Sequence, residues 1–288
     1  MALSPLPMSI KLNKSRNVDP KTVQGFGEEW HRFTQSKLSM KEHEDAFQLY
    51  FSIFPWGKLQ KDAVGFDLGC GSGRWAMLVA PRVGKLHCID PSTALDVARM
   101  NLSNLKNCEF HNATVGEIPL SNSSMDFGYS LGVLHHCPDT QEGLNECVKK
   151  LKAGAPFLVY LYYNFENRPW WFRVIWRLTD MMRRVISRLP HGLRYWVSQI
   201  IAASVYFPLA RLSWAVERLG FSSKKIPLSI YRNLSFYLMR TDALDRFGTR
   251  LEQRFSYSQI KEMMLKSGLE NIEFSRTAPF WCAVGYRK

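Results

Sequence analysis

Short apolar runs alternate with longer amphipathic segments along the middle of the chain. Segments in which apolar residues recur at helical spacing separate runs of strand type. Regular alternation of this kind predicts a mostly parallel sheet wrapped by helices through right-handed crossovers. Five strand-like runs are present: VGFDL (64–68), LHCID (86–90), CEFHN (108–112), DFGYSLG (126–132) and PFLVYLYY (156–163).

The pattern differs at the N-terminus. Residues 1–25 are polar and contain proline, which predicts an arm, and residues 1–16 hold no apolar run of signal-peptide length. A helix is predicted from Glu28 to Phe54, and the Pro-Trp-Gly sequence at 55–57 ends it.

The strand–helix alternation stops at Asn164 and resumes near Phe255. There a helix leads into two further strand-like runs, 271–275 and 280–286. The sequence therefore predicts a seven-stranded, Rossmann-like α/β fold with a helical insertion. Its expected parts are an N-terminal arm and helix (1–57), the first half of the core (58–167), a basic, Trp-rich helical cap (168–240) and the C-terminal completion of the core sheet (241–288).

The net charge of +13 is concentrated in the predicted cap. Residues 168–240 contain 13 Lys and Arg and only two acids, Asp180 and Glu217, which leaves a charge of +11 there. Any explanation of the basic character must therefore concern the cap. The six cysteines are scattered, without metal-ligand spacing, which predicts reduced thiols and no metal site.

A glycine-rich sequence follows the first strand-like run and opens a helix. It reads DLGCGSG, and its three glycines allow a sharp turn and let a ligand approach bare backbone. The second run ends at Asp90, which a parallel sheet places beside this loop at the carboxyl edge. A carboxylate in that position can accept hydrogen bonds from both hydroxyls of a ribose. The loop and the acid together predict a ligand-binding site.

With these motifs, residues 64–163 and the C-terminal FSYSQIKEMMLKSGL resemble class I S-adenosylmethionine-dependent methyltransferases of the methyltransferase-11, quinone-methylase-like group. SMDFGYSLGVLHH and LKAGAPFLVY match further motifs of that group, whereas Asn112 replaces its usual acid. The resemblance implies S-adenosylmethionine as the cofactor and S-adenosylhomocysteine as the product. The cofactor-binding residues that it implies are Asp67, Gly69, Cys70, Gly71, Gly73, Asp90, Pro91, Asn112, Ala113, Thr114, Ser130 and Leu131.

Methyl transfer from a sulfonium requires mainly alignment and exclusion of water, because the cofactor supplies the electrophile. The sequence therefore identifies no obligatory catalytic residue. For each candidate, packing without a chemical role is the alternative. The candidates follow the fourth and fifth strand-like runs: His135, His136, Tyr162, Tyr163 and Glu166.

The predicted cap contains two contrasting segments. Residues 168–190 place arginines on much of the side opposite an apolar stripe, and 195–210 are uncharged, too short to span a bilayer and interrupted near Pro208. Three interpretations remain open. The cap is a lid with solvated arginines, a lid or interfacial helix that attracts an anionic acceptor or anionic lipid, or a nucleic-acid surface.

The resulting hypothesis is methyl transfer to a bulky, largely apolar or lipid-like small molecule, in one version with an anionic group. The alternatives are a cofactor-binding regulatory or partner protein without turnover, and a nucleic-acid methyltransferase. The expected location is the cytoplasm, with or without peripheral contact between residues 168–240 and an anionic membrane. Neither the acceptor atom nor the oligomeric state follows from the sequence.

Overall fold

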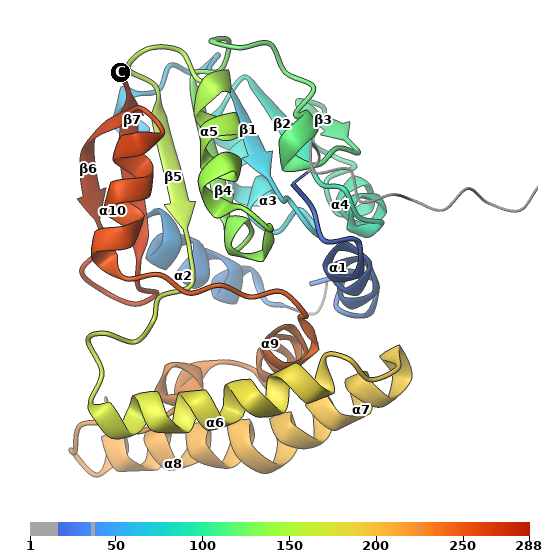
Figure 1. Ribbon diagram of the computed structural model, residues 1–288, viewed down its shortest axis with the longest axis vertical. Coiled ribbons are helices and arrows are strands. Elements are labelled where there is room, and N and C mark those ends of the chain that lie inside the picture. The colour runs from blue at the N-terminus through green and yellow to red at the C-terminus, as the bar shows by residue number, and fades with distance from the viewer. Residues whose placement is uncertain (1–16, 36–37, 224) are drawn as a thin grey trace, which may run out of the picture.

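The computed structural model describes residues 17–35, 38–223 and 225–288, and its centre is a seven-stranded sheet (Figure 1). The strand order is β3-β2-β1-β4-β5-β7-β6, with β7 antiparallel to both of its neighbours and the pairs from β3 to β5 parallel. The predicted Rossmann-like sheet is thus confirmed. The strands are β1 (Val64–Leu68), β2 (Lys85–Ile89), β3 (Cys108–His111), β4 (Phe127–Leu131), β5 (Pro156–Tyr160), β6 (Leu269–Phe274) and β7 (Cys282–Arg287).

Helices cover both faces of the sheet. One apolar cluster includes Phe51, Val79 and Ala98 from α2, α3 and α4, and a second includes Leu144 and Ile260 from α5 and α10. Because β4 and β5 lie between these clusters, nearly all of their residues are buried, which explains their continuous apolar runs. The helices of this part are α1 (Pro20–Arg32), α2 (Met40–Phe51), α3 (Ala76–Val79), α4 (Ala94–Asn101), α5 (Thr140–Lys150) and α10 (Tyr257–Lys266).

A separate helical layer lies at the carboxyl edge of the sheet, in the lower part of Figure 1. Its own apolar cluster includes Ile186, Ala202, Tyr206, Met239 and Phe247. The last helix of the layer crosses the predicted boundary at residue 240. The layer consists of α6 (Trp170–Ile186), α7 (His191–Ile201), the π-helical turn η6 (Ala202–Tyr206), α8 (Phe207–Arg218), the 3₁₀ helix η7 (Ser229–Asn233) and α9 (Phe236–Gly248).

The N-terminal segment is more helical than predicted. Helix α1 begins at Pro20, and the Asp19 side chain accepts a hydrogen bond from the backbone N–H of Thr22. An aspartate N-cap followed by proline is a strong helix start, so the end of the predicted arm is wrong. The part of that arm within residues 1–16 lies outside the described residues.

The single helix predicted over 28–54 is two helices, α1 and α2. Gln35, between them, has a φ of 65°, which is incompatible with a right-handed helix. Ser39 and Glu42 then form a capping box that starts α2. The second start signal therefore overrides the apolar periodicity across the break.

Helices α7, η6 and α8 form one continuous helix from His191 to Arg218. The predicted interruption near Pro208 is wrong, because the preceding π-helical turn accommodates the proline, which lacks an N–H donor. By length and composition this 28-residue helix could cross a membrane, and 28% of its most apolar window is buried inside the protein.

Candidate functional site

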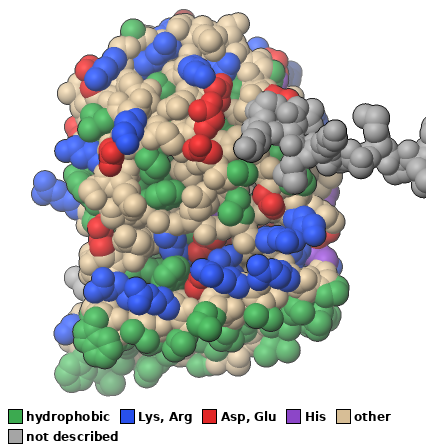
Figure 2. Space-filling view, in the orientation of Figure 1, with side chains coloured by type: hydrophobic (Ala, Val, Ile, Leu, Met, Phe, Trp, Pro, Cys, Tyr) green, Lys and Arg blue, Asp and Glu red, His purple; other side chains and the backbone are tan. Residues whose placement is uncertain are grey.

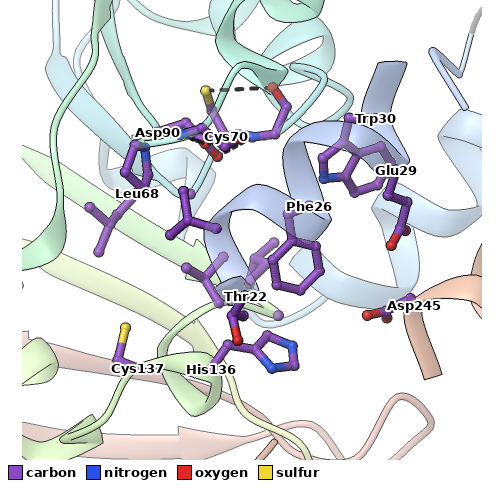
Figure 3. A pocket seen from close by; sticks show the side chains of 18 of the residues that line it. Thr22, Phe26, Glu29, Trp30, Leu68, Cys70, Asp90, His136, Cys137 and Asp245 are labelled. Carbon is purple, nitrogen blue, oxygen red and sulfur yellow. Dashed lines mark hydrogen bonds between the residues drawn. The ribbon is translucent and has the colours of Figure 1, made fainter. Parts of the chain in front are cut away.

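A cavity lies at the carboxyl edge of the sheet, between the strand ends and helices α1 and α9 (Figure 3). The space between its lining atoms, open solvent at the mouth included, is about 1190 Å³. The glycine-rich loop and Asp90 line one end, and Thr22 and His136 line the other. The glycine-rich loop and His136 therefore line one common cavity.

The glycine-rich loop depends on the absence of side chains. Gly69, Gly71 and Gly73 have φ values of +76°, +53° and +79°. A Cβ on Gly69 would lie 2.3 Å from the side chain of Val133, and one on Gly71 would lie 3.1 Å from the indole nitrogen of Trp30. The loop therefore presents bare backbone where Val133, which follows β4, and Trp30, on α1, approach it.

Replacing Gly69 with alanine is expected to lower the free energy of unfolding by about 2–4 kcal/mol, because it adds a clash with Val133 to the strain of a positive φ. The matched control is Gly154→Ala, since Gly154 has a φ of +77° but nothing within 4 Å of its added Cβ. Urea denaturation of both variants measures the difference. Equal losses would contradict the packing role of Gly69.

Asp90 follows β2 and is held by three protein hydrogen bonds. Its Oδ2 accepts from the Gly71 N–H (3.0 Å), and its Oδ1 accepts from the backbone N–H (2.9 Å) and the hydroxyl (2.6 Å) of Ser92. Because a carboxylate offers about four acceptor positions, one position on Oδ2 remains for a ligand. Asp90 therefore fixes the loop and still has capacity for one strong hydrogen bond.

His136 combines a fixed tautomer with an unpartnered ring nitrogen. Its Nδ1 lies 2.6 Å from the carbonyl oxygen of Leu251, which can only accept, so Nδ1 carries the proton. Burial lowers the pKa of His136, and the Asp245 carboxylate partly offsets this effect. The ring is therefore neutral near pH 7. Its basic Nε2 is buried and has no hydrogen-bond partner among the described residues.

The neighbouring His135 has a different environment. It is completely buried, its ring stacks on Tyr162 with centroids 3.8 Å apart, and it does not line the cavity. Burial lowers its pKa well below the usual value. Of the two candidate histidines, only His136 lies in the cavity wall, where Figure 3 places it beside Thr22.

Carboxyl groups line the part of the cavity next to His136. Asp245 accepts a hydrogen bond from the Tyr162 hydroxyl at 2.6 Å, and burial raises the pKa of Asp242 to about 6. Burial, together with the negative charges of these two aspartates, also raises the pKa of Glu29 well above its usual value. This part of the cavity favours cationic groups and hydrogen-bond donors.

Comparison with known proteins indicates the family. The methyltransferase domain model matches residues 66–159. A Mycolicibacterium smegmatis protein assigned as an S-adenosylmethionine-dependent methyltransferase is 26% identical over 157 residues, which cover 54% of this chain and 52% of that protein. The match thus spans about half the length of this relative.

Residues 66–159 therefore form a class I S-adenosylmethionine-dependent methyltransferase domain.

Solved structures share the fold of this chain at low identity. A chain in the complex between the Haloferax volcanii methyltransferase activator Trm112 and its methyltransferase partner is 14% identical with a TM-score of 0.50, covering 91% of this chain and 96% of that chain. A Nostoc punctiforme protein assigned as an O-methyltransferase is 11% identical with a TM-score of 0.51, covering 90% and 60%.

S-adenosylmethionine is the cofactor of such a domain, and the methyltransferase cavity fits it. The hydroxyls of Ser72 and Thr114 are buried at the cavity without partners among the described residues. Asp90 retains an acceptor position for a ribose hydroxyl. The carboxyl groups of Asp242 and Asp245 can attract the positive charge of a sulfonium. These groups match the polar, ribose and cationic portions of the cofactor.

Most of the predicted cofactor-binding residues of the methyltransferase line the cavity. They are Gly69, Cys70, Gly71, Asp90, Pro91, Ala113, Thr114 and Leu131. Asp67 and Ser130 do not, because their side chains bind within the sheet: Tyr129 donates to Asp67 at 3.0 Å, and Ser130 donates to the Leu68 carbonyl at 3.1 Å. Burial raises the pKa of Asp67 to about 8.

Two more predicted cofactor residues of the methyltransferase lie outside the cavity lining. A Cβ on Gly73 would lie 2.8 Å from Leu102, so this glycine allows α4 to pack against the loop. The Asn112 amide donates to the Asp90 carbonyl at 3.4 Å. Gly73 and Asn112 therefore contact the residues around the glycine-rich loop and Asp90 without lining the cavity.

Of the predicted catalytic candidates, Tyr162 lines the cavity as His136 does, whereas Tyr163 and Glu166 do not. Tyr163 packs on Phe280, with ring centroids 5.6 Å apart. Glu166 accepts hydrogen bonds from the backbone N–H of Tyr257 (2.6 Å) and the indole of Trp281 (3.1 Å). These contacts join the chain after β5 to the C-terminal segment.

Sequence reasoning missed the walls that α1, α2 and α9 contribute to the methyltransferase cavity. The sequence predicts an arm and an undivided helix where α1 lies, and it assigns the acids of α9 to the completion of the sheet. Their helical spacing was the available signal. The missed residues include Phe26, Glu29, Trp30, Tyr50, Asp242 and Asp245.

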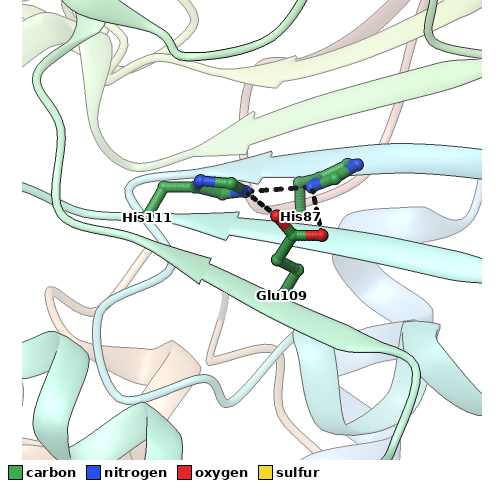
Figure 4. Close-up of side chains that lie close together, drawn as sticks. All are labelled: His87, Glu109 and His111. Atoms are coloured by element: carbon green, nitrogen blue, oxygen red, sulfur yellow. Dashed lines mark hydrogen bonds and ion pairs between the residues drawn. The ribbon is translucent and has the colours of Figure 1, made fainter.

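A second polar cluster lies on β2 and β3, away from the cavity (Figure 4). The Nδ1 of His87 and the Nε2 of His111 are 3.0 Å apart, and Glu109 lies beside both rings. Lys85 pairs with Glu109 at 2.5 Å. An ammonium group therefore already balances the carboxylate, and the four side chains join an edge strand to its neighbour.

Proposed function

We propose that this protein transfers a methyl group from S-adenosylmethionine to an O–H or N–H group of a bulky, largely apolar, lipid-like small molecule. One observation carries the proposal. A single cavity joins the glycine-rich loop and Asp90 to the neutral, unpartnered Nε2 of His136. This arrangement supports cofactor binding at one end of the cavity and proton removal by His136 at the other.

When bound, S-adenosylmethionine supplies an electrophilic methyl carbon and retains the electron pair of the broken carbon–sulfur bond as the neutral thioether product. His136 supplies the complementary function, because its Nε2 lone pair can take the proton that the acceptor loses. Leu251 holds the ring through Nδ1 and fixes the orientation of that lone pair. The ring centroids of Phe26, on α1, and His136 are 5.0 Å apart. An acceptor therefore reaches the His136 ring by displacing the Phe26 side chain.

The lining supports an apolar acceptor. Phe26, Trp30 and Trp75 contribute aromatic surface, and Leu131 and Val133 contribute aliphatic surface. Such a lining stabilises a large apolar ligand by removing its surface from water. It also excludes water from the reacting groups, which prevents competing proton transfers.

The cavity argues against an anionic group at the reacting end of the acceptor. Glu29, Asp242 and Asp245 lie there and outnumber the one arginine of the lining, Arg74, and none of the arginines of residues 168–240 lines the cavity. A hydroxyl or an amine would instead donate to these carboxyls. The basic residues of the helical layer therefore do not select the acceptor by direct contact in this structure.

The test is transfer of a radiolabelled methyl group from S-adenosylmethionine into a host-cell extract, followed by separation into organic, aqueous and macromolecular fractions. Label in the organic fraction is the expected result. Label confined to the aqueous or macromolecular fraction would reject a lipid-like acceptor, and the macromolecular fraction would favour a nucleic-acid or protein substrate. Cofactor binding without formation of S-adenosylhomocysteine would favour a regulatory protein without turnover.

A further inference from the structure

The outer face of the helical layer, formed by the exposed apolar side chains of α6, α7 and α8, is unusually apolar. Trp170, Leu178 and Met181 of α6 are 71%, 58% and 65% exposed, and Trp196 and Ile200 of α7 are 65% and 63% exposed. All but five of the exposed large apolar side chains among the described residues lie between residues 170 and 236. An apolar surface of this extent marks an interaction site.

A row of arginines borders this outer face. The row consists of the exposed Arg173, Arg177, Arg184 and Arg188. The first three follow one edge of α6, between its buried side and its apolar side, and Arg188 follows the end of the helix. Figure 2 shows apolar side chains across the lower surface and a band of Lys and Arg immediately above it. The helix therefore separates three environments: protein core, cationic edge and apolar outer surface.

The positive charge of the arginine row is largely uncompensated. Asp180 lies on the buried side of α6 and pairs with Arg183 at 2.7 Å and with Arg184 at 3.0 Å. Among the described residues, Arg173 and Arg177 form no salt bridge with an acidic group. The row can thus attract an anionic surface, an effect that salt weakens.

We propose that the outer face binds to an anionic lipid bilayer, with α6 and the helix from His191 to Arg218 lying in the plane of the interface. Apolar side chains then enter the acyl boundary, and the arginine row lies at the level of the lipid headgroups. Tryptophan and arginine are well suited to this depth, because each has an apolar body and a polar end. Arg218 already stacks on Trp214, with its guanidinium 4.0 Å from the ring centroid.

The attachments of the long helix favour this orientation over a membrane-spanning one. Near its start, Arg194 donates to the carbonyl of Gly248 at 3.2 Å and pairs with Glu28 at 3.2 Å. Near its end, Arg211 donates to the carbonyl of Arg232 at 3.3 Å. Both ends are thus fixed to the same folded body, and crossing a bilayer would break one set of these contacts.

Co-sedimentation of the full chain with lipid vesicles tests the proposal independently of methyl transfer. The protein should sediment with phosphatidylcholine vesicles that contain about 30% phosphatidylglycerol, and more weakly with pure phosphatidylcholine vesicles. Adding salt should reduce the difference. Leu178→Glu combined with Trp196→Glu should abolish binding, whereas Leu265→Glu on α10, at a residue that is 46% exposed, should not.

The electrostatic part has its own matched pair of variants. Arg173→Gln, Arg177→Gln and Arg188→Gln together should weaken binding to the anionic vesicles roughly 100-fold, about five-fold for each residue. The control removes three exposed lysines elsewhere, Lys61→Gln, Lys106→Gln and Lys261→Gln, and should change binding only slightly. Equal losses in the two triple variants would overturn the role of the row.

Three other results would overturn the proposal as a whole. The first is failure of the wild-type chain to sediment with anionic vesicles. The second is a dimer in analytical ultracentrifugation that Leu178→Glu dissociates, because a second copy of the chain would then cover the outer face. The third is resistance of the membrane-bound protein to extraction at alkaline pH, which is the behaviour of a protein with a membrane-spanning helix. Loss of methyl transfer with intact vesicle binding would instead count only against the proposed function.

Discussion

Replacing His136 with asparagine is expected to lower kcat by roughly 10²–10⁴-fold, the usual contribution of a positioned general base. Asparagine retains a donor for the Leu251 carbonyl but has no basic atom at the position of Nε2. The affinity for S-adenosylmethionine should remain within a few-fold of wild type, because His136 lies at the opposite end of the cavity from Asp90. Single-turnover kinetics and calorimetry separate the two effects.

The pH profile provides a second readout of the base. Because burial lowers the pKa of His136, Nε2 is unprotonated at neutral pH, and the rate should fall only as the pH decreases through this lowered pKa. Asp245, Glu252, Arg254 and His135 are the charged or titratable groups that affect the ring. The acidic limb attributable to His136 should be absent from the asparagine variant.

His135 provides the matched control for these experiments. His135→Phe preserves an aromatic ring against Tyr162 and alters no residue that lines the cavity. Its kcat should stay within a few-fold of wild type. A full rate with His136→Asn, or an equal loss with His135→Phe, would contradict the assignment of the base.

Replacing Asp90 with alanine is expected to weaken cofactor binding by about 1.5–3 kcal/mol, or roughly 10–150-fold, as for loss of a hydrogen bond to a charged group. We expect the upper end of this range, because the substitution also frees the Gly71 N–H, which Asp90 holds at 3.0 Å. Calorimetric titration with S-adenosylhomocysteine measures the change.

The control for Asp90 is asparagine, which keeps one acceptor oxygen and should lose less affinity than alanine. Thermal unfolding of both variants must accompany the titrations, since Ser92 also depends on this carboxylate. Folded Asp90→Ala protein with wild-type affinity would contradict the ribose site.

The part of the site that the sequence predicts follows from local rules. Two neighbouring parallel strands bring the glycine-rich loop after one strand and the acid after the other to the same edge of the sheet. Gly71 and Asp90 could therefore be identified from the sequence. Their orientation could not. Asp67 belongs to the same motif, yet its side chain turns towards Tyr129 inside the sheet.

The remaining walls depend on tertiary packing. Helical periodicity shows that α1 and α9 are helices, but it does not show which of their sides faces the cavity. Trp30 and Asp245 lie more than two hundred residues apart in the sequence and line the same space. The apolar outer face is a similar case, since an amphipathic stripe is equally consistent with a buried side and with a side that contacts lipid.

Helix α9 belongs to two environments at once. Met239, Ala243 and Phe247 pack in the apolar cluster of the helical layer, while Asp242 and Asp245, on the same helix, line the cavity. One rigid element therefore joins the helical layer, for which we propose lipid binding, to the cavity. If the layer docks on a bilayer, any shift of α9 gives a coupling free energy between the two sites. Such coupling is reciprocal: the factor by which a bilayer changes cofactor affinity must equal the factor by which the cofactor changes affinity for the bilayer.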